Sequence, residues 1–187
     1  MAEPLLRQGP VLPALPWLKL LPPATRLIFQ GARPARDAAA LAFGVPFAEE
    51  ACRARTHGGR ATLWMGPDEY LLLDTDTPVA PPVEAPAAFV AIRDALGTVP
   101  CSLVDISHRQ VAFELTGPHA AAILEAGCPL DLDGSQFPPG MCTRTLFAKA
   151  DILLWRTGAE SFHVEVWRSF SDYLSALCSE VARDIVP

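Results

Sequence analysis

The stretch "VDISHRQVAFELTGPHAAAILEAGCPLDL", residues 104–132, decides the fold, because it joins two halves of the chain that repeat one order of elements. Val111, Phe113 and Leu115 occupy every second position, which predicts a strand over 109–117 with one buried face. "PHAAAILEAG" (118–127) opens with proline and closes with glycine, a pattern typical of a helix. The apolar segment "SLVDIS" (102–107) predicts a further strand just before them.

The residues before this stretch predict the same kinds of elements. "TRLIFQG" (25–31) indicates a strand, "ARDAAALAFG" (35–44) a helix, "GRATLWMGPDEYLLLD" (59–74) a hairpin, and "APAAFVAIRDALG" (85–97) a second helix. With the strand at 102–107, the order is β-α-β-β-α-β, which is that of a ferredoxin-like unit.

The residues after the stretch follow a similar order. "RTLFAKADILLWR" (144–156) and "SFHVEVWR" (161–168) indicate strands, and "SFSDYLSALCSEVARDIV" (169–186) indicates a closing helix. "LAFGVPF" (41–47) aligns with "LEAGCPL" (124–130); the same offset places Thr62 on Thr145 and Asp68 on Asp151. A chance likeness of two Ala-rich helices is the alternative interpretation.

We therefore predict an α+β fold of two packed ferredoxin-like β-α-β-β-α units within one compact unit. The predicted parts are a proline-rich extended arm (1–24), a first half (25–107) and a second half (108–187). Prolines in the arm exclude a regular helix or a central strand. Leu15, Trp17 and Leu18 make the arm apolar, so it packs either on its own domain or on a partner, and the sequence leaves both open.

Composition narrows the choice of partners. Charged residues make up 19% of the chain, below the usual figure of about 25%, which suggests that something else covers part of the surface. The net charge of −6 and the lack of a Lys/Arg run argue against nucleic acid and membrane surfaces. The N-terminus does not resemble a signal peptide, and we expect a cytoplasmic protein.

No residue set predicts catalysis or metal binding. The five cysteines are scattered without a close pair, which argues against disulfides and a zinc site. Ser107 and His108 are neighbours on an extended segment, so their side chains point to opposite faces and cannot form a catalytic pair. We interpret Asp105, Ser107 and His108 as a structural strand-end motif whose polar groups bond the backbone of the turn.

Two other polar positions leave alternatives open. Asp151 lies between apolar runs, where a carboxylate marks a sheet edge, a bulge or a pocket. Arg168 follows a tryptophan, a pairing that suits a protein interface, an anionic ligand or ordinary packing on a sheet face.

Several ordered segments carry a resemblance to a known family. They are "MGPDEYLLL" (65–73), residues 104–132 quoted above, "FPPGMCTRTLFAKADILLWRTG" (137–158) and "FHVEVWRSFSDYL" (162–174). Together they resemble the gamma subunits of heterotetrameric sarcosine oxidases. A strand of the form D-[VI]-S-H followed by a glycine and a helix is also distantly similar to the folate-dependent aminomethyltransferases. The hairpin that carries a Gly-Gly segment and paired aspartates in those enzymes reads Ala148-Lys149-Ala150-Asp151 here.

The resemblance implies a structural subunit of an assembly that oxidises sarcosine to glycine, and we expect the isolated chain not to be catalytic. It implies alpha, beta and delta subunits as partners, which would hold FAD, FMN, NAD and tetrahydrofolate, with no cofactor on this chain. One alternative function is a folate-binding, aminomethyltransferase-like protein in which Asp151 and Arg144 or Arg168 hold a pterin or its glutamate tail. Another is a self-associating scaffold that forms a homo-oligomer through the arm.

Overall fold

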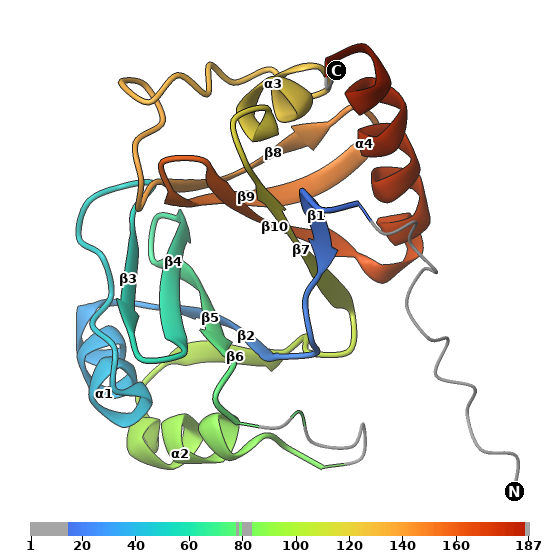
Figure 1. The fold of residues 1–187 in the computed structure, drawn as a ribbon. Coiled ribbons are helices and arrows are strands. Elements are labelled where there is room, and N and C mark those ends of the chain that lie inside the picture. Colours follow the sequence, from blue (N-terminus) through green and yellow to red (C-terminus); the bar gives the residue numbers. More distant parts are fainter. Residues whose placement is uncertain (1–14, 78, 80–83, 186–187) are drawn as a thin grey trace, which may run out of the picture.

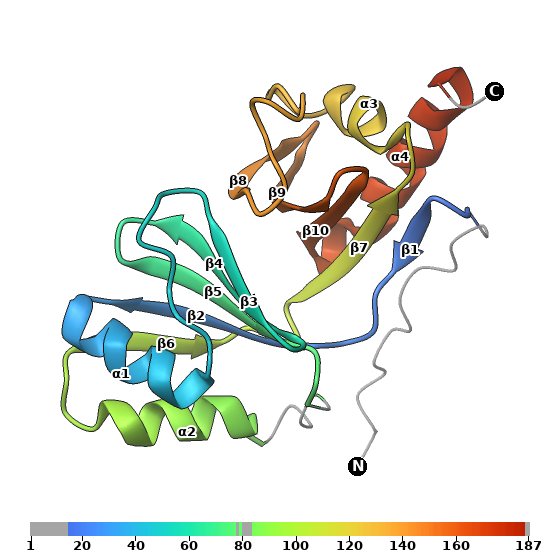
Figure 2. The same ribbon diagram turned by 60° about the vertical axis from the view of Figure 1, so that its left-hand side comes forward.

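Two antiparallel sheets, each covered by helices on its outer face, make up the part of the chain that the computed structural model describes, residues 15–77, 79 and 84–185. Figures 1 and 2 show α1 and α2 on one side of the molecule and α3 and α4 on the other, with the sheets between them. The chain passes from the first sheet to the second between Asp105 and Gln110. The observed class is α+β, as predicted from the sequence.

The first sheet has the strand order β3-β4-β5-β2-β6. Its strands are β2 (Thr25–Gly31), β3 (Ala54–His57), β4 (Arg60–Gly66), β5 (Glu69–Asp74) and β6 (Cys101–Asp105). The helices α1 (Arg33–Phe43) and α2 (Ala87–Leu96) cover its outer face. Gly44 caps the C-terminus of α1, and its φ of 79° is in the left-handed region that glycine adopts without strain.

The second sheet has the strand order β1-β7-β10-β9-β8. Its strands are β1 (Leu18–Leu20), β7 (Gln110–Thr116), β8 (Cys142–Phe147), β9 (Ala150–Gly158) and β10 (Ser161–Trp167). The helices α3 (Ala120–Glu125) and α4 (Ser171–Ile185) cover it, and the short 3-10 helix η1 (Arg168–Phe170) joins β10 to α4.

Each half has one strand more than the predicted β-α-β-β-α unit. The prediction missed β3, and it treated 144–156 as one strand where the structure has the hairpin β8–β9. The chain reverses at Ala148 and Lys149, between the paired residues Phe147 and Ala150. Ala148 adopts a φ of 51°, a conformation usual for glycine and asparagine, so no ordinary turn residue marks this hairpin.

The two halves share one order of strands and helices, but the strands do not correspond at the predicted spacing of residues. Following the chain, β2, β3, β4 and β5 of the first sheet correspond to β7, β8, β9 and β10 of the second. Strand β1 then takes the position beside β7 that β6 takes beside β2. The alignment of Thr62 with Thr145 is therefore wrong beyond the helices, because Thr62 lies on β4 and Thr145 on β8. Asp68 likewise lies in a turn with φ 59°, whereas Asp151 lies within β9.

The described part of the arm packs on the chain's own second sheet. Leu18 pairs with Leu115 of β7 and is buried in the core beneath α3 and α4. Leu15 and Trp17 are partly buried against the same core. Leu18 is therefore part of the chain's own core and not of an exposed surface.

Apolar side chains form three layers. One cluster lies between the first sheet and α1 and α2, and another lies between the second sheet and α3 and α4. The third lies between the inner faces of the two sheets and includes Leu63, Leu71 and Ile106 from the first half with Cys142 and Leu153 from the second. The sheets are thus fixed against each other by a continuous apolar layer.

Candidate functional site

A buried polar cluster of Arg26, His163 and Glu165 lies in the layer between the sheets. Arg26 Nε donates to Glu165 Oε2 at 2.6 Å, and Arg26 Nη1 donates to the carbonyl oxygen of Ala24 at 2.9 Å. His163 Nε2 is 2.8 Å from Glu165 Oε1. Both oxygens of the Glu165 carboxylate therefore have a nitrogen partner.

Strand geometry explains why these polar side chains meet. Side chains alternate between the two faces of a strand. On β2, Leu27 and Phe29 point to the helices, so Arg26 points to the other sheet. On β10, Phe162 and Val164 point to the helices, so Glu165 points back toward Arg26.

The pKa of Glu165 shows which form the carboxyl takes. Burial of this carboxyl by itself raises its pKa, but the charge of Arg26 and the hydrogen bond and charge of His163 outweigh burial, and the pKa is lowered. Glu165 is therefore ionised at neutral pH and is shielded from solvent by its partners. A carboxylate held in this way joins the two sheets and is poorly suited to general acid–base catalysis, which needs a pKa near the working pH.

The strand-end turn between the two halves joins this cluster. The backbone N–H and the hydroxyl of Ser107 donate to Asp105 Oδ1 at 2.9 and 2.5 Å. The backbone N–H of Arg26 donates to Ser107 Oγ at 2.9 Å. His108 is half-buried in the same turn. Asp105 and Ser107 thus fix the crossing point of the chain to β2 through backbone groups.

The three residues predicted as ligand-binding candidates lie on β8, on β9 and in η1, and they share no interaction with one another. Arg144 on β8 donates to Glu69 Oε2 at 2.6 Å and to the carbonyl oxygen of Met65 at 3.0 Å, so it links the two halves. Asp151 is exposed at the start of β9, opposite Leu146. Arg168 is half-exposed in η1.

Two of the buried thiols are protonated at neutral pH. Burial raises the pKa of Cys142 to about 12 and that of Cys178 to about 12. Because the thiolate is the reactive form, these cysteines are not nucleophiles under ordinary conditions. Within residues 15–77, 79 and 84–185, no three His, Cys, Asp or Glu side chains gather in a way that could hold a metal ion.

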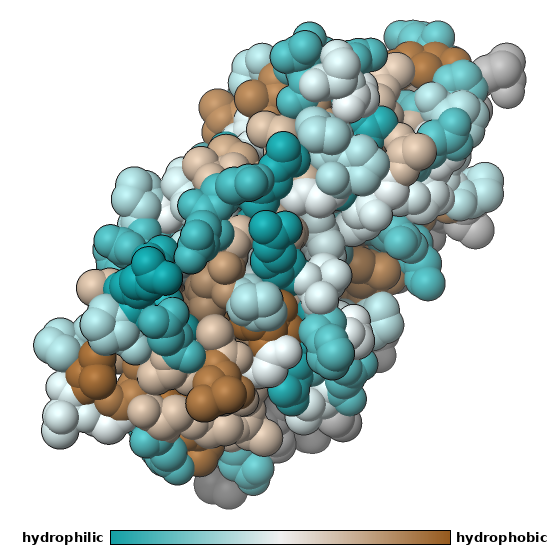
Figure 3. Space-filling view, turned by 90° about the vertical axis from the view of Figure 1, so that its left-hand side faces the viewer, coloured by the Kyte–Doolittle hydropathy of each residue, from teal (hydrophilic) through white to brown (hydrophobic). Residues whose placement is uncertain are grey.

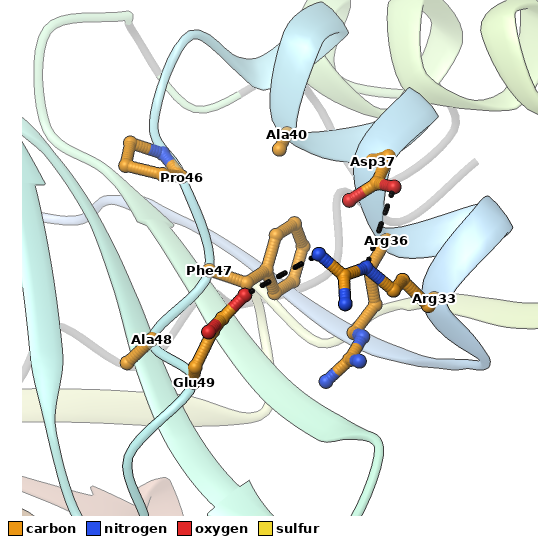
Figure 4. Close-up of a pocket in the computed structure, with 8 residues that line it drawn as sticks. All are labelled: Arg33, Arg36, Asp37, Ala40, Pro46, Phe47, Ala48 and Glu49. Carbon is orange, nitrogen blue, oxygen red and sulfur yellow. Dashed lines mark ion pairs between the residues drawn. The ribbon is translucent and has the colours of Figure 1, made fainter.

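A small pocket of about 160 Å³ lies beside α1 (Figure 4). Arg33 at its rim is 3.7 Å from Glu49 and 4.0 Å from Asp37. Arg36 donates to the hydroxyl of Tyr70 at 3.1 Å. The pocket's cationic groups therefore already have partners within the chain, which weakens the case for an anionic ligand there.

Sequence reasoning did not single out Arg26, His163 or Glu165. In "FHVEVW" the polar residues alternate with apolar ones, which is also the pattern of a strand with one face in water. Nothing in that pattern tells that a second sheet covers the polar face. An arginine directly before the apolar run "LIF" (27–29) was the one available signal.

Comparison with known proteins places this architecture in a family. The model of the sarcosine oxidase, gamma subunit family matches residues 30–183. The chain belongs to this family. It is 36% identical over 115 residues to a sarcosine oxidase subunit gamma of Corynebacterium sp. (strain U-96), across 62% of this chain and 52% of the relative. It is 37% identical over 129 residues to that of an Arthrobacter sp., across 68% and 58%. The chain thus spans about half the length of the curated relatives it matches.

Solved structures agree with the family. A chain of the heterotetrameric sarcosine oxidase from Corynebacterium sp. U-96, in complex with pyrrole 2-carboxylate, matches with a TM-score of 0.81 and 28% identity. The match covers 91% of this chain and 85% of that one. The glycine cleavage system aminomethyltransferase T from Bartonella henselae matches with a TM-score of 0.61 and 15% identity, over 86% and 44%. This second likeness shows a shared fold.

No helix within the described part of this family member is both long and apolar enough to cross a membrane.

Proposed function

We propose that this chain is the gamma subunit of a cytoplasmic heterotetrameric sarcosine oxidase, and that it supports the oxidative demethylation of sarcosine to glycine as an assembly component. The observation that carries the proposal is the match, over 91% of the chain, to a chain of the heterotetrameric Corynebacterium enzyme. Family membership over residues 30–183 supports it independently.

The chemistry of the described residues supports a structural role. The buried charges of Arg26 and Glu165 are paired across the sheet interface, and the thiols of Cys142 and Cys178 are held protonated. Arg144, the predicted ligand-binding residue with the best-defined contacts, ties the halves together through Glu69. These groups fix the relative position of two sheets, which a subunit needs if it is to present a rigid surface to partners.

In this proposal the alpha, beta and delta subunits are the partners. They hold FAD, FMN, NAD and tetrahydrofolate, and the oxidation of sarcosine takes place on them. This chain contributes its folded surface to the complex and does not supply a reacting group.

Co-expression with and without the chain tests the proposal. The proposed alpha, beta and delta subunits are purified through a tag on the largest one, and sarcosine oxidation and flavin absorbance are measured. We expect the tagged complex to contain this chain in a one-to-one ratio with each partner, and the isolated chain to show neither turnover nor a flavin spectrum. Turnover by the isolated chain, or a fully active complex that never retains it, would contradict the proposal.

Calorimetric titration of the isolated chain with tetrahydrofolate separates this role from folate binding. We expect no heat of binding. Saturable heat that disappears in Asp151→Asn would instead support the aminomethyltransferase-like alternative.

A further inference from the structure

The exposed aromatic side chains of this chain are gathered in one short segment. Trp167, Phe170 and Tyr173 are 46%, 39% and 36% exposed. Every other aromatic side chain within the described residues is buried or half-buried. Three large apolar groups within seven positions therefore face water at the junction of β10, η1 and α4.

This segment is held in a defined shape. The rings of Phe170 and Tyr173 meet edge to face, with 6.2 Å between centroids. The Arg109 guanidinium lies over the Trp167 ring, 4.8 Å from its centroid. The backbone N–H of Arg168 donates to the carbonyl oxygen of Arg109 at 3.0 Å. We call these five residues the aromatic surface.

The arginines of the aromatic surface differ from most others in the chain. Most described arginines form an ion pair with a carboxylate, as Arg26 and Arg144 do. Within the described residues, neither Arg109 nor Arg168 has such a partner, although the chain carries a net charge of −6. The one acidic residue of the segment, Asp172, lies in the first turn of α4, where the helix N-terminus stabilises it.

Residue types and charge together indicate the chemistry of what covers this surface. Tryptophan, tyrosine and arginine dominate the energetics of protein interfaces, at positions where an aromatic anchor enters a pocket on the partner. Guanidinium groups without a carboxylate partner, at the margin of the aromatic surface, are complemented best by carboxylates on the partner. A symmetric dimer through this surface would place the arginines of one copy against those of the other, which is unfavourable.

We propose that the aromatic surface docks onto a larger subunit of the oxidase, at a recess that is apolar at its centre and carries carboxylates at its rim. The inference rests on the proposed function and adds to it the place of contact. Trp167 is the central anchor, Phe170 and Tyr173 extend the apolar area, and Arg109 and Arg168 form ion pairs at the margin.

Binding of the purified chain to the immobilised complex of the other three subunits tests the inference. Trp167→Ala should raise the dissociation constant by at least about 30-fold, which is the effect of losing an interface anchor. Arg109→Glu should weaken it about tenfold, chiefly through the association rate, and the effect should shrink as salt rises. Each variant is first checked by circular dichroism for an unchanged spectrum and thermal midpoint.

Two matched controls lie on the first half of the chain. Leu41→Ala removes an apolar side chain on α1 that is 87% exposed, and Arg55→Glu reverses an exposed arginine on β3 that has no ion pair among the described residues. Figure 3 shows the face over α1, where apolar residues also gather between polar ones, so these controls probe the competing surface. Both should bind within twofold of the wild type.

The outcomes separate this inference from the proposed function. If the wild-type chain does not bind the other subunits, the proposed function fails. If the wild type binds and the folded Trp167→Ala and Arg109→Glu variants bind equally well, the docking surface is wrong. Loss of binding in the α1 and β3 controls alone would move the contact to the first half. A change confined to self-association, measured by light scattering, would assign the surface to a second copy and overturn the inference.

Discussion

Replacing Glu165 with glutamine should destabilise the protein far more than the same replacement at Glu69. The two carboxylates accept a hydrogen bond from an arginine at the same distance, 2.6 Å, in the pairs Arg26–Glu165 and Arg144–Glu69. They differ in burial, since the side chains of the first pair are 2% and 0% exposed and those of the second 53% and 26%. Apart from the contact of Glu165 with His163, the two pairs therefore differ chiefly in burial.

The magnitude follows from the charge left behind. Glu165→Gln leaves the Arg26 guanidinium buried with only neutral partners, a change that costs about 3–5 kcal/mol of unfolding free energy. For a chain of this size that corresponds to a fall of roughly 6–20 °C in the thermal midpoint. Glu69→Gln breaks a solvent-screened pair and should cost at most about 1 kcal/mol. Arg26→Met combined with Glu165→Leu removes both charges and should recover most of the loss.

Urea unfolding followed by circular dichroism measures these free energies. The pH dependence gives an independent check on the sign. Because the folded-state pKa of Glu165 lies below its ordinary value of 4.5, its contribution is present above that pH and is lost as pH falls through the folded-state pKa. The gap between wild type and Glu165→Gln should therefore narrow in acid. A fall of less than about 1 kcal/mol in the unfolding free energy of Glu165→Gln would refute this reasoning. So would a double replacement whose loss is simply the sum of the separate losses caused by Arg26→Met and Glu165→Leu.

Three further changes test other parts of the fold. Leu18→Ala should lower the unfolding free energy by about 2–5 kcal/mol, because Leu18 is buried in the second core. Lys19→Ala, at the exposed neighbouring position, should change the unfolding free energy little. Equal effects of the two substitutions in a urea titration would argue against the placement of β1. Gly127→Ala should lower the unfolding free energy by about 1–3 kcal/mol, because the new Cβ would lie 2.7 Å from the ring of the buried Phe147. An unchanged midpoint in thermal unfolding would contradict this and show that the ring has room to move. Burial raises the pKa of Cys142 from 9.0 to about 12, so the thiol of the unfolded state loses its proton first as pH rises, and the unfolding free energy should fall across this range. Cys142→Ala should make this fall less steep in urea titrations at several alkaline pH values. An unchanged slope would contradict burial of the thiol.

The family and the two-fold plan of strands and helices could be predicted from the sequence. The predicted strand at 25–31 is observed as Thr25–Gly31, and the helix predicted at 85–97 is observed over Ala87–Leu96. Alternation of apolar residues and glycine or proline at helix ends are local signals, so one sequence is enough to detect them. The hairpin between β8 and β9 was not predicted, because the residue that adopts a positive φ there, Ala148, is not of a type that usually marks turns.

Only the tertiary structure decided what covers the polar face of each strand. A period of two tells that Arg26 and Glu165 lie opposite the apolar side chains of their strands, but not whether water or a second sheet lies beyond them. Their pairing joins residues 139 positions apart, a separation over which no periodicity carries information. The placement of β1 beside β7 was equally undetermined, because a three-residue apolar segment does not specify which sheet edge and which core receive it.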